Sequence, residues 1–267
     1  MRTATEMEKQ TGFETLRLAL VGKEKSGKSR LAATAPKPVL VLDFDGRKES
    51  IAGIPGVYAI TYRDEAWPKQ PSGYSDFLDD LSKLEKEASL ADLGFSSTEH
   101  PATVIADSVT SLSRFIMNYE LYTNTDIRRS IKVGGYETFF PKNFDAWNAE
   151  MSTMEAILLR LLGLPMHIII TMHETAEEAP DSTLDKPRYT GRVTPFPARH
   201  GRLLRYFNEV WRVERNGKIP TVQTVPDYYF TAATNLLIDK VDKPDITDLI
   251  RLHTEAYNKG RTNASKS

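Results

Sequence analysis

Four short apolar runs dominate the pattern of hydrophobic and polar positions along the chain, and each is followed by glycine or by polar side chains. They cover residues 16–22, 38–46, 102–108 and 166–174. Apolar runs of this length are typical of strands that are buried on both faces of a parallel sheet. The pattern therefore predicts a central parallel sheet, and a weaker run at 57–60 is a candidate for a further strand.

Segments with helical spacing of apolar residues separate the predicted strands. We expect helices over 28–35, 76–94, 110–122, 145–165 and 246–259. Strands that alternate with helices are typical of an α/β protein in which helices cover a mostly parallel sheet. The predicted fold class is therefore α/β.

Polar stretches at 123–145 and 175–200 interrupt this alternation, and both are predicted to be long loops. The segments 205–214 and 221–234 are rich in β-branched and aromatic residues, which favours late antiparallel strands.

The predicted domain organisation has three parts. We expect a flexible lead over 1–15, a single core domain over 16–240, and a C-terminal helix with a basic tail over 241–267.

Composition excludes several kinds of chemistry. The chain has no cysteine, so disulfides, thiolate zinc sites and cysteine nucleophiles are excluded. No apolar run approaches the length of about 18 residues that a membrane helix needs, and we expect a cytoplasmic protein without a membrane partner. The formal net charge is −1, so nucleic-acid binding would require a local basic patch.

The segment after the first apolar run fits the phosphate-loop pattern G-x-x-x-x-G-K-[ST] at every fixed position. Two glycines allow a tight turn whose N–H groups point at phosphate oxygens, and the following helix presents its positive end to the anion. The lysine reaches the β- and γ-phosphates, and the serine hydroxyl binds Mg²⁺. The predicted nucleotide-binding residues are Gly22, Lys23, Glu24, Lys25, Ser26, Gly27, Lys28 and Ser29.

Carboxylates follow two of the other predicted strands. Asp107 ends the third apolar run, where an aspartate can hold Mg²⁺ together with Ser29. The next residue is Ser108 and not glutamate, so a base for hydrolysis would have to come from a neighbouring strand. Asp43 and Asp45 are the candidates, with the alternative that they only cap the turn after their strand.

The fourth apolar run ends in the polar residues Thr171 and His173. The carboxyl ends of parallel strands form the edge where α/β folds bind ligands. His173 is therefore a candidate site residue, and the alternative is that it is only a polar strand terminus.

Four motifs occur in the order and at roughly the spacing found in the RecA/RadA recombinase core: LALVGKEKSGKS, VLVLDFDG, TVIADSVTSL and IIITMHE. The chain resembles more closely the phage-encoded RecA-like nucleotide-binding proteins, the single-strand annealing ATPases of the Sak-four type. Residues 197–214 and 221–234 are similar to the C-terminal half of that family. The resemblance covers about 16–240.

The resemblance implies a RecA-like P-loop NTPase core that binds ATP and Mg²⁺ through Lys28, Ser29 and Asp107. Asp45 matches the position of a glutamate that activates water in recombinases, and it is one methylene shorter, which implies slow hydrolysis. His173 matches a glutamine that senses the γ-phosphate. The family assembles into rings or filaments with sites between subunits, which makes an arginine supplied in trans an expectation; the candidates are Arg199, Arg202 and Arg205.

In RecA-like cores, DNA-binding loops follow the third and fourth strands. Basic and aromatic side chains, which bind phosphates and stack on bases, occur in both corresponding loops here. The candidate DNA-binding residues are Arg128, Arg129, Lys132, Tyr136, Lys142, Lys186, Arg188 and Arg192. The alternatives are that the aromatic residues of the first loop pack beneath it and that the second loop is solvated with mixed charge.

The sequence therefore predicts a phage-type ATPase that acts on single-stranded DNA in recombination or annealing, in the cytoplasm of a bacterial host. Its expected partners are single-stranded DNA, further copies of the chain and a single-strand-binding protein. An ATPase acting on a protein partner in packaging, loading or regulation is the alternative. A nucleotide-dependent module with negligible turnover is a third reading, and a small-molecule kinase is disfavoured because no lid or acceptor site is evident.

Overall fold

The computed structural model describes most of the chain. The described residues are 15–64, 70–177, 188–192, 203–216, 219–227, 229–230, 232–234, 240–242, 244–252 and 254–255. The predicted lead at 1–15 lies almost entirely outside them.

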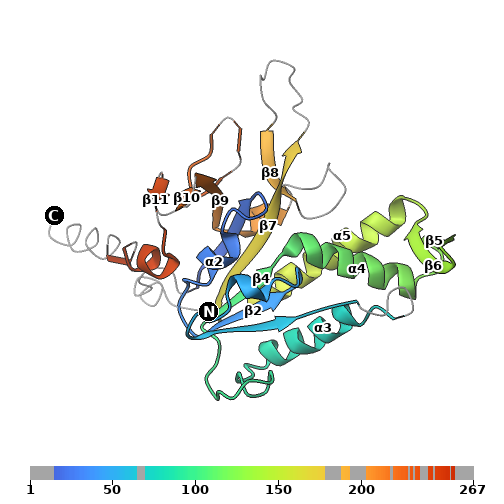
Figure 1. The fold of residues 1–267 in the computed structure, drawn as a ribbon, viewed down its shortest axis with the longest axis horizontal. Coiled ribbons are helices and arrows are strands. Elements are labelled where there is room, and N and C mark those ends of the chain that lie inside the picture. Colours follow the sequence, from blue (N-terminus) through green and yellow to red (C-terminus); the bar gives the residue numbers. More distant parts are fainter. Residues whose placement is uncertain are drawn as a thin grey trace, which may run out of the picture.

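Within the described residues, a sheet of nine strands forms the centre of the molecule (Figure 1), in the order β11-β10-β9-β1-β7-β4-β2-β3 with β8 paired to β7. The strands from β9 to β3 are parallel, and β8, β10 and β11 are antiparallel to their neighbours. Their bounds are β1 Arg17–Gly22, β2 Val39–Asp43, β3 Val57–Thr61, β4 Thr103–Asp107, β7 His167–Glu177, β8 Arg188–Arg192, β9 Glu209–Asn216, β10 Ile219–Gln223 and β11 Lys240–Asp242. The predicted α/β class with late antiparallel strands is confirmed.

Helices cover both faces of this sheet. On one face α3 (Ser72–Glu85), α4 (Val109–Thr123) and α5 (Phe144–Gly163) bury the larger hydrophobic cluster. On the other face α2 (Lys28–Ala32) and a helical segment at 246–252 bury the second. In the described part of the chain, no helix is long and apolar enough to cross a membrane.

The predicted helix over 76–94 is wrong at its C-terminal end, because α3 stops at Glu85. Beyond it, the Asp92 carboxylate accepts hydrogen bonds from the Ser89 N–H and hydroxyl groups. Such local side-chain bonds compete with the helical pattern and favour a turn.

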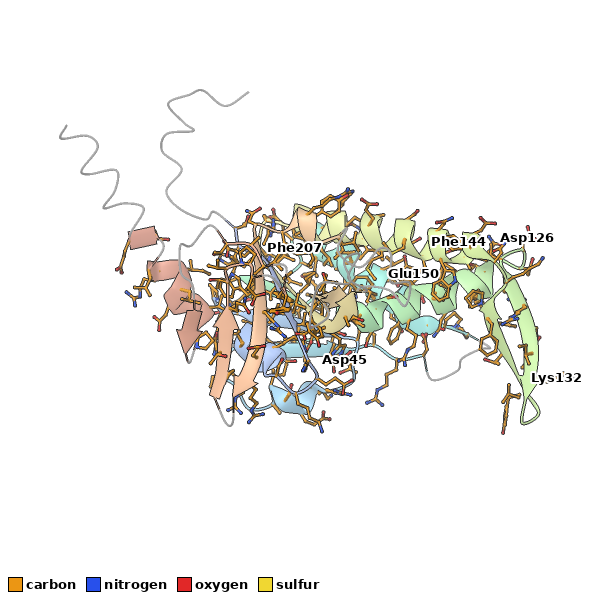
Figure 2. All side chains as sticks on the ribbon, turned by 90° about the horizontal axis from the view of Figure 1, so that it is seen from above. Asp45, Asp126, Lys132, Phe144, Glu150 and Phe207 are labelled. Atoms are coloured by element: carbon orange, nitrogen blue, oxygen red, sulfur yellow. The ribbon has the colours of Figure 1, made fainter. Side chains whose placement is uncertain are left out.

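The predicted loop over 123–145 is also wrong, because it forms the hairpin β5 (Arg128–Val133) and β6 (Tyr136–Pro141). Gly134 and Gly135, both with positive φ, make the two-residue turn that such hairpins favour. The strand pattern is hard to recognise because most of the side chains are exposed and polar. Figure 2 shows Lys132 at the outer end of this hairpin, well away from Asp45.

The predicted loop over 175–200 is wrong at its start, because β7 continues to Glu177 and pairs with β8. His173 therefore lies within a strand and not at its terminus. Thr175, Tyr189 and Thr190 have the side chains that favour strands. At Gly191 an added Cβ would lie 2.7 Å from the Met172 sulfur, so only glycine allows β8 to pack this closely.

Core packing of α5 gives a stability prediction. Leu161 is fully buried in the larger cluster, whereas Leu159 on the same helix is 50% exposed. Leu161→Ala should lower the free energy of unfolding by about 2–5 kcal/mol, because it leaves a cavity. Urea unfolding measures this. Leu159→Ala is the matched control and should change stability by less than about 0.5 kcal/mol; equal effects of the two substitutions would contradict the packing described.

Candidate functional site

The carboxyl ends of four parallel strands bring the site together. In the sheet register Gly22 of β1 lies beside His173 of β7, and Asp43 of β2 lies beside Asp107 of β4. Because β7 lies between β1 and β4, Thr171 is placed beside Asp107. Residues that are distant in the sequence therefore meet at one edge of the sheet.

The loop between β1 and α2 has the shape of an anion cradle. At Gly22 an added Cβ would lie 2.3 Å from the Val213 carbonyl oxygen, so a larger residue would push the loop away from β9. Gly27 has φ 102° and serves as the N-cap of α2, a conformation that favours glycine. The Ser26 hydroxyl is buried and has no hydrogen-bond partner among the described residues. It is available to a ligand in the cradle.

Lys28 is the first residue of α2, and its buried side chain reaches back to this loop. Its ammonium group donates hydrogen bonds of 2.9 Å to the carbonyl oxygens of Gly22 and Lys23. Burial lowers the pKa of Lys28, although Asp107 and Asp45 act in the opposite direction. A nearby phosphate would compensate the buried charge better than carbonyl dipoles do. The cradle and the lysine therefore fit the phosphates of a nucleoside triphosphate.

Asp107 is held by hydroxyl groups from two sides. The Thr171 hydroxyl donates to its Oδ1, and the neighbouring Ser29 hydroxyl also favours the charged carboxylate. Burial nevertheless raises the pKa of Asp107, and the negative charges of Asp45 and Asp43 add to that shift. A divalent cation beside this carboxylate would favour its charged form.

The donor set fits Mg²⁺ bound together with phosphate. Within the described ranges, no group of three or more histidines, aspartates or glutamates could hold a metal by itself. Ser29 and Asp107 would therefore contribute ligands alongside phosphate oxygens, as in other phosphate-loop sites. When bound, Mg²⁺ would neutralise charge on those oxygens.

The structure separates the roles of the two aspartates after β2. Asp43 is buried, and its Oδ1 accepts hydrogen bonds from the N–H groups of Asp45 (3.1 Å) and Arg47 (3.2 Å), while its Oδ2 accepts one from the Thr61 hydroxyl. Asp43 therefore caps the turn and is no candidate base. Its capping places Asp45 at the site.

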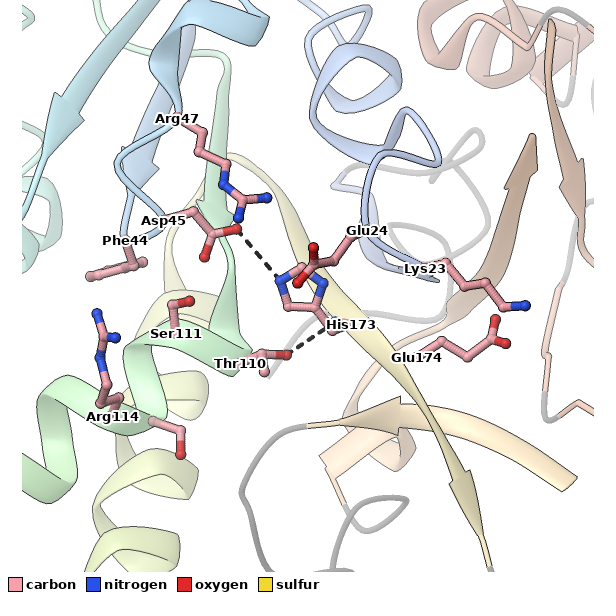
Figure 3. Close-up of a pocket in the computed structure, with 11 residues that line it drawn as sticks. Lys23, Glu24, Phe44, Asp45, Arg47, Thr110, Ser111, Arg114, His173 and Glu174 are labelled. Atoms are coloured by element: carbon pink, nitrogen blue, oxygen red, sulfur yellow. Dashed lines mark hydrogen bonds and ion pairs between the residues drawn. The ribbon is translucent and has the colours of Figure 1, made fainter. Parts of the chain in front are cut away.

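Of these two aspartates, Asp45 is the one that lines the cavity shown in Figure 3. Burial opposes its ionisation, but the neighbouring His173, Ser111 and Ser108 side chains outweigh burial and hold the pKa of Asp45 well below its usual value. The Ser108 hydroxyl donates to Asp45 Oδ1 at 2.9 Å. Asp45 is therefore ionised at neutral pH and fixed in position.

His173 lies next to Asp45 and is held by α4, the helix that follows β4. Its backbone N–H donates to the Thr110 hydroxyl at 3.0 Å, and its Nε2 lies 3.6 Å from Asp45 Oδ2. Its Nδ1 is buried and has no hydrogen-bond partner among the described residues. Both His173 and Asp45 thus contact the N-terminal end of α4.

Two adjoining cavities open at this edge. The inner cavity, of about 380 Å³, is lined by the phosphate loop and Asp107. The outer cavity, of about 600 Å³, extends to the start of α4. Asp45, Arg47 and His173 line both. These three side chains lie at the boundary between the two cavities, next to where the terminal phosphate of a nucleotide in the inner cavity would lie.

Sequence reasoning missed several of these contacts. Arg47 directly follows the motif VLVLDFDG and Thr110 lies within TVIADSVTSL, but nothing in the local pattern distinguished them from ordinary turn and helix residues. Glu174 is buried and accepts a bidentate ion pair from Arg212 at 2.9 and 3.0 Å. Its partner lies on a distant strand, so only the tertiary structure reveals this pair.

Other predicted residues lie away from this site or outside the described residues. Arg205 binds Glu155 of α5 at 2.9 Å and also contacts Tyr206, while Arg199 and Arg202 fall outside the described residues. The hairpin residues Arg128, Arg129, Lys132, Tyr136 and Lys142 lie at or next to β5 and β6. Lys186 is outside the described residues, and Arg188 and Arg192 are described only as members of β8.

The sheet, the glycine-rich loop and the helix that follows it define a P-loop NTPase, the class of α/β proteins that holds nucleotide phosphates between a strand and a helix N-terminus. A family model described as an AAA domain matches residues 14–219, and the chain belongs to that family. It therefore carries an AAA-type P-loop ATPase domain. No curated protein matches the chain.

The buried position of Lys28 gives a binding prediction. Lys28→Ala should weaken ATP binding by at least about 100-fold, because it removes charge-assisted hydrogen bonds to phosphate. Calorimetry with ATP·Mg²⁺ measures this. The fold should persist, since a desolvated charge is removed, and Lys28→Met tests the charge alone because it keeps the aliphatic stem.

Lys48→Ala, at an exposed position beyond the site, is the control and should bind ATP normally. Unchanged ATP affinity in both Lys28 variants would show that the loop does not hold the triphosphate.

Proposed function

We propose that this protein is a RecA-like ATPase of the phage single-strand annealing type, which hydrolyses ATP while bound to single-stranded DNA. One observation carries the DNA-binding part of the proposal: a basic and aromatic hairpin stands at the far end of α4, whose near end contacts Asp45 and His173. Nucleotide and DNA would then bind at opposite ends of one helix.

The hairpin offers the chemistry that a single strand requires. Tyr136 is 79% exposed and is free to stack on a base. Arg129 lies over the Phe140 ring, and Lys132 stands on the same strand near the turn. Positive charge for phosphates and an exposed aromatic ring for bases are the two components of sequence-independent binding to single strands.

Two other hairpin residues support the structure instead. The Arg128 guanidinium donates to the carbonyl oxygens of Leu121 and Tyr122 at 3.0 Å, which ties the hairpin to α4. Phe139 lies beneath that guanidinium and packs against a small buried cluster at the hairpin base. The surface for DNA would therefore be the outer part of the hairpin.

In the proposed reaction, Lys28 and the phosphate loop bind ATP, and Ser29 and Asp107 hold Mg²⁺. Asp45 orients the attacking water, because a fixed and ionised carboxylate can accept a hydrogen bond from it. Phosphoryl transfer depends mainly on positioning and on charge stabilisation, so a weakly basic carboxylate is sufficient for this role. His173 would donate a hydrogen bond to the γ-phosphate and thereby report its presence to α4 through Thr110.

Assembly into a ring or filament remains part of the proposal, as do an arginine supplied in trans and a single-strand-binding partner protein. They rest on the resemblance to recombinases.

Removal of the Asp45 charge should separate binding from turnover. Asp45→Asn should keep ATP affinity within a few-fold and lower the turnover rate by about 10²–10⁴-fold, the usual effect of losing such a group. A phosphate-release assay measures the rate. Asp79→Asn, an exposed aspartate on α3, is the control. Full turnover in Asp45→Asn would assign water activation to a different group.

Hairpin variants test the DNA-binding surface. Tyr136→Ala should cost about 1–3 kcal/mol of affinity for a thymidine oligonucleotide, because one stacked base is lost. Arg129→Ala and Lys132→Ala should each weaken binding and reduce the salt dependence by about one phosphate contact. Fluorescence anisotropy at several salt concentrations measures both effects.

Lys83→Ala on α3 is the control for lost positive charge. The same assays should show that the oligonucleotide raises the ATPase rate of the unaltered protein. Undiminished DNA binding in all three hairpin variants would contradict the proposed surface.

A protein partner is the second candidate for the hairpin. Val133 is 59% exposed and Ile131 is 41% exposed on β5, and apolar side chains at such a tip favour contact with protein. If the protein hydrolyses ATP without the oligonucleotide, and the oligonucleotide does not change that rate, a protein partner is favoured.

A further inference from the structure

Arg47 occupies a distinctive place between the two cavities. It follows Asp45 by two residues and lines the inner cavity together with Lys28 and Asp107. It also lines the outer cavity, as Asp45 and His173 do. Figure 3 shows its side chain extending along the same side of the cavity as Asp45. A guanidinium at this position lies on the side where a terminal phosphate would meet its nucleophile.

The backbone of Arg47 is anchored, although its side chain is exposed. Its N–H donates to Asp43 Oδ1 at 3.2 Å, and Asp43 is itself buried and bound by Thr61. The base of the side chain is thus fixed relative to Asp45. The guanidinium remains able to turn toward a ligand.

The Arg47 guanidinium has no carboxylate within ion-pairing distance among the residues that the structure describes. Other arginines form ion pairs within the chain, for example Arg212 with Glu174, Arg160 with Glu85 and Arg205 with Glu155. A positive charge beside a site, without an internal partner, is available for an anion that arrives from outside.

The charges of the other residues in the site indicate which anion Arg47 would bind. Lys28 lies among Asp107, Asp45 and further carboxylates, all of which repel a triphosphate. Arg215 also lines the inner cavity, but from the opposite side, where that cavity adjoins residues 23–26 and 212–215. Lys25 and Arg30 also line the inner cavity, but they belong to the phosphate loop and to α2. On the Asp45 side, Arg47 is placed to offset the charge on the γ-phosphate oxygens as the bond to the leaving group breaks.

We propose that Arg47 supplies, from the same chain as the phosphate loop, the guanidinium that stabilises the transferring γ-phosphate. This inference rests on the proposed ATPase function and assigns a catalytic residue to it. It is an alternative to the arginine supplied in trans, because the guanidinium already lines the cavity of its own chain. A planar fork can bind two phosphate oxygens at once, which a lysine cannot do.

Substitution of Arg47 tests the role. Arg47→Ala should leave the affinities for ATP and ADP within about threefold while lowering the turnover rate by about 10³-fold or more, the usual contribution of such an arginine. It should also abolish the tight binding of ADP with aluminium fluoride, which imitates the transferring group. Arg47→Lys should recover only part of the rate.

Arg114→Ala is the matched control, because Arg114 lines only the outer cavity of these two and makes no ion pair in the described part of the chain. It should keep the unaltered rate. An equal loss of turnover rate in Arg47→Ala and Arg114→Ala would show that Arg47 contributes only general positive charge. That result would overturn the inference.

Mixing of variants distinguishes action within one chain from action between chains. Lys28→Ala and Arg47→Ala should both be inactive, and a mixture of the two should stay inactive, because no chain carries both residues. Rescue of turnover in the mixture would show that Arg47 acts in trans. A normal rate in Arg47→Ala would overturn the inference but leave the ATPase intact, whereas absence of turnover in the unaltered protein would overturn both.

Discussion

Parallel pairing of β1, β7, β4 and β2 is the constraint on which the rest of the structure depends. All four strands end at the same edge, and their register brings Gly22 beside His173 and Asp43 beside Asp107. A shift of one residue in any pair would send every side chain of the shifted strand to the opposite face of the sheet. Burial of the apolar residues on both faces prevents that shift. The hydrophobic core therefore determines the geometry of the polar site.

The site contains several buried charged side chains whose charges are not fully neutralised by one another. Asp107 and Lys28 are both desolvated. Burial raises the pKa of Asp107 and lowers the pKa of Lys28, which favours the neutral form of each. Asp45 differs, because hydroxyl and imidazole groups hold its charged form. Such an arrangement is costly in the absence of ligand, and a bound triphosphate with its cation would relieve part of that cost. Ligand binding would accordingly stabilise the fold as well as fill the cavity.

The sequence was sufficient to predict the four central parallel strands β1, β2, β4 and β7 and the phosphate loop, because apolar runs and a motif with fixed spacing are local signals. It could not separate Asp43 from Asp45, since the distinction depends on Thr61 of a neighbouring strand. Arg47 was missed for the same reason: its importance comes from the cavities that it lines. The hairpin at 128–141 was mistaken for a loop, because exposed strands lack the alternation that a buried face imposes. Local patterns thus predicted elements, whereas the roles of single residues required their tertiary neighbours.

The hairpin of β5 and β6 has a further consequence for the dynamics of the chain. Its base is secured, because Ile127 is buried with residues of α4 and α5, and Arg128 binds carbonyl oxygens of α4. Toward the turn the side chains are exposed, and the contacts described there, such as the hydrogen bond from the Ser130 hydroxyl to Glu137, stay within the hairpin. Isolated two-stranded ribbons are only marginally stable in water. Local opening therefore requires little free energy at Gly134 and Gly135 and much more at Ile127, so amide protection should rise steadily from the tip of the hairpin to its root.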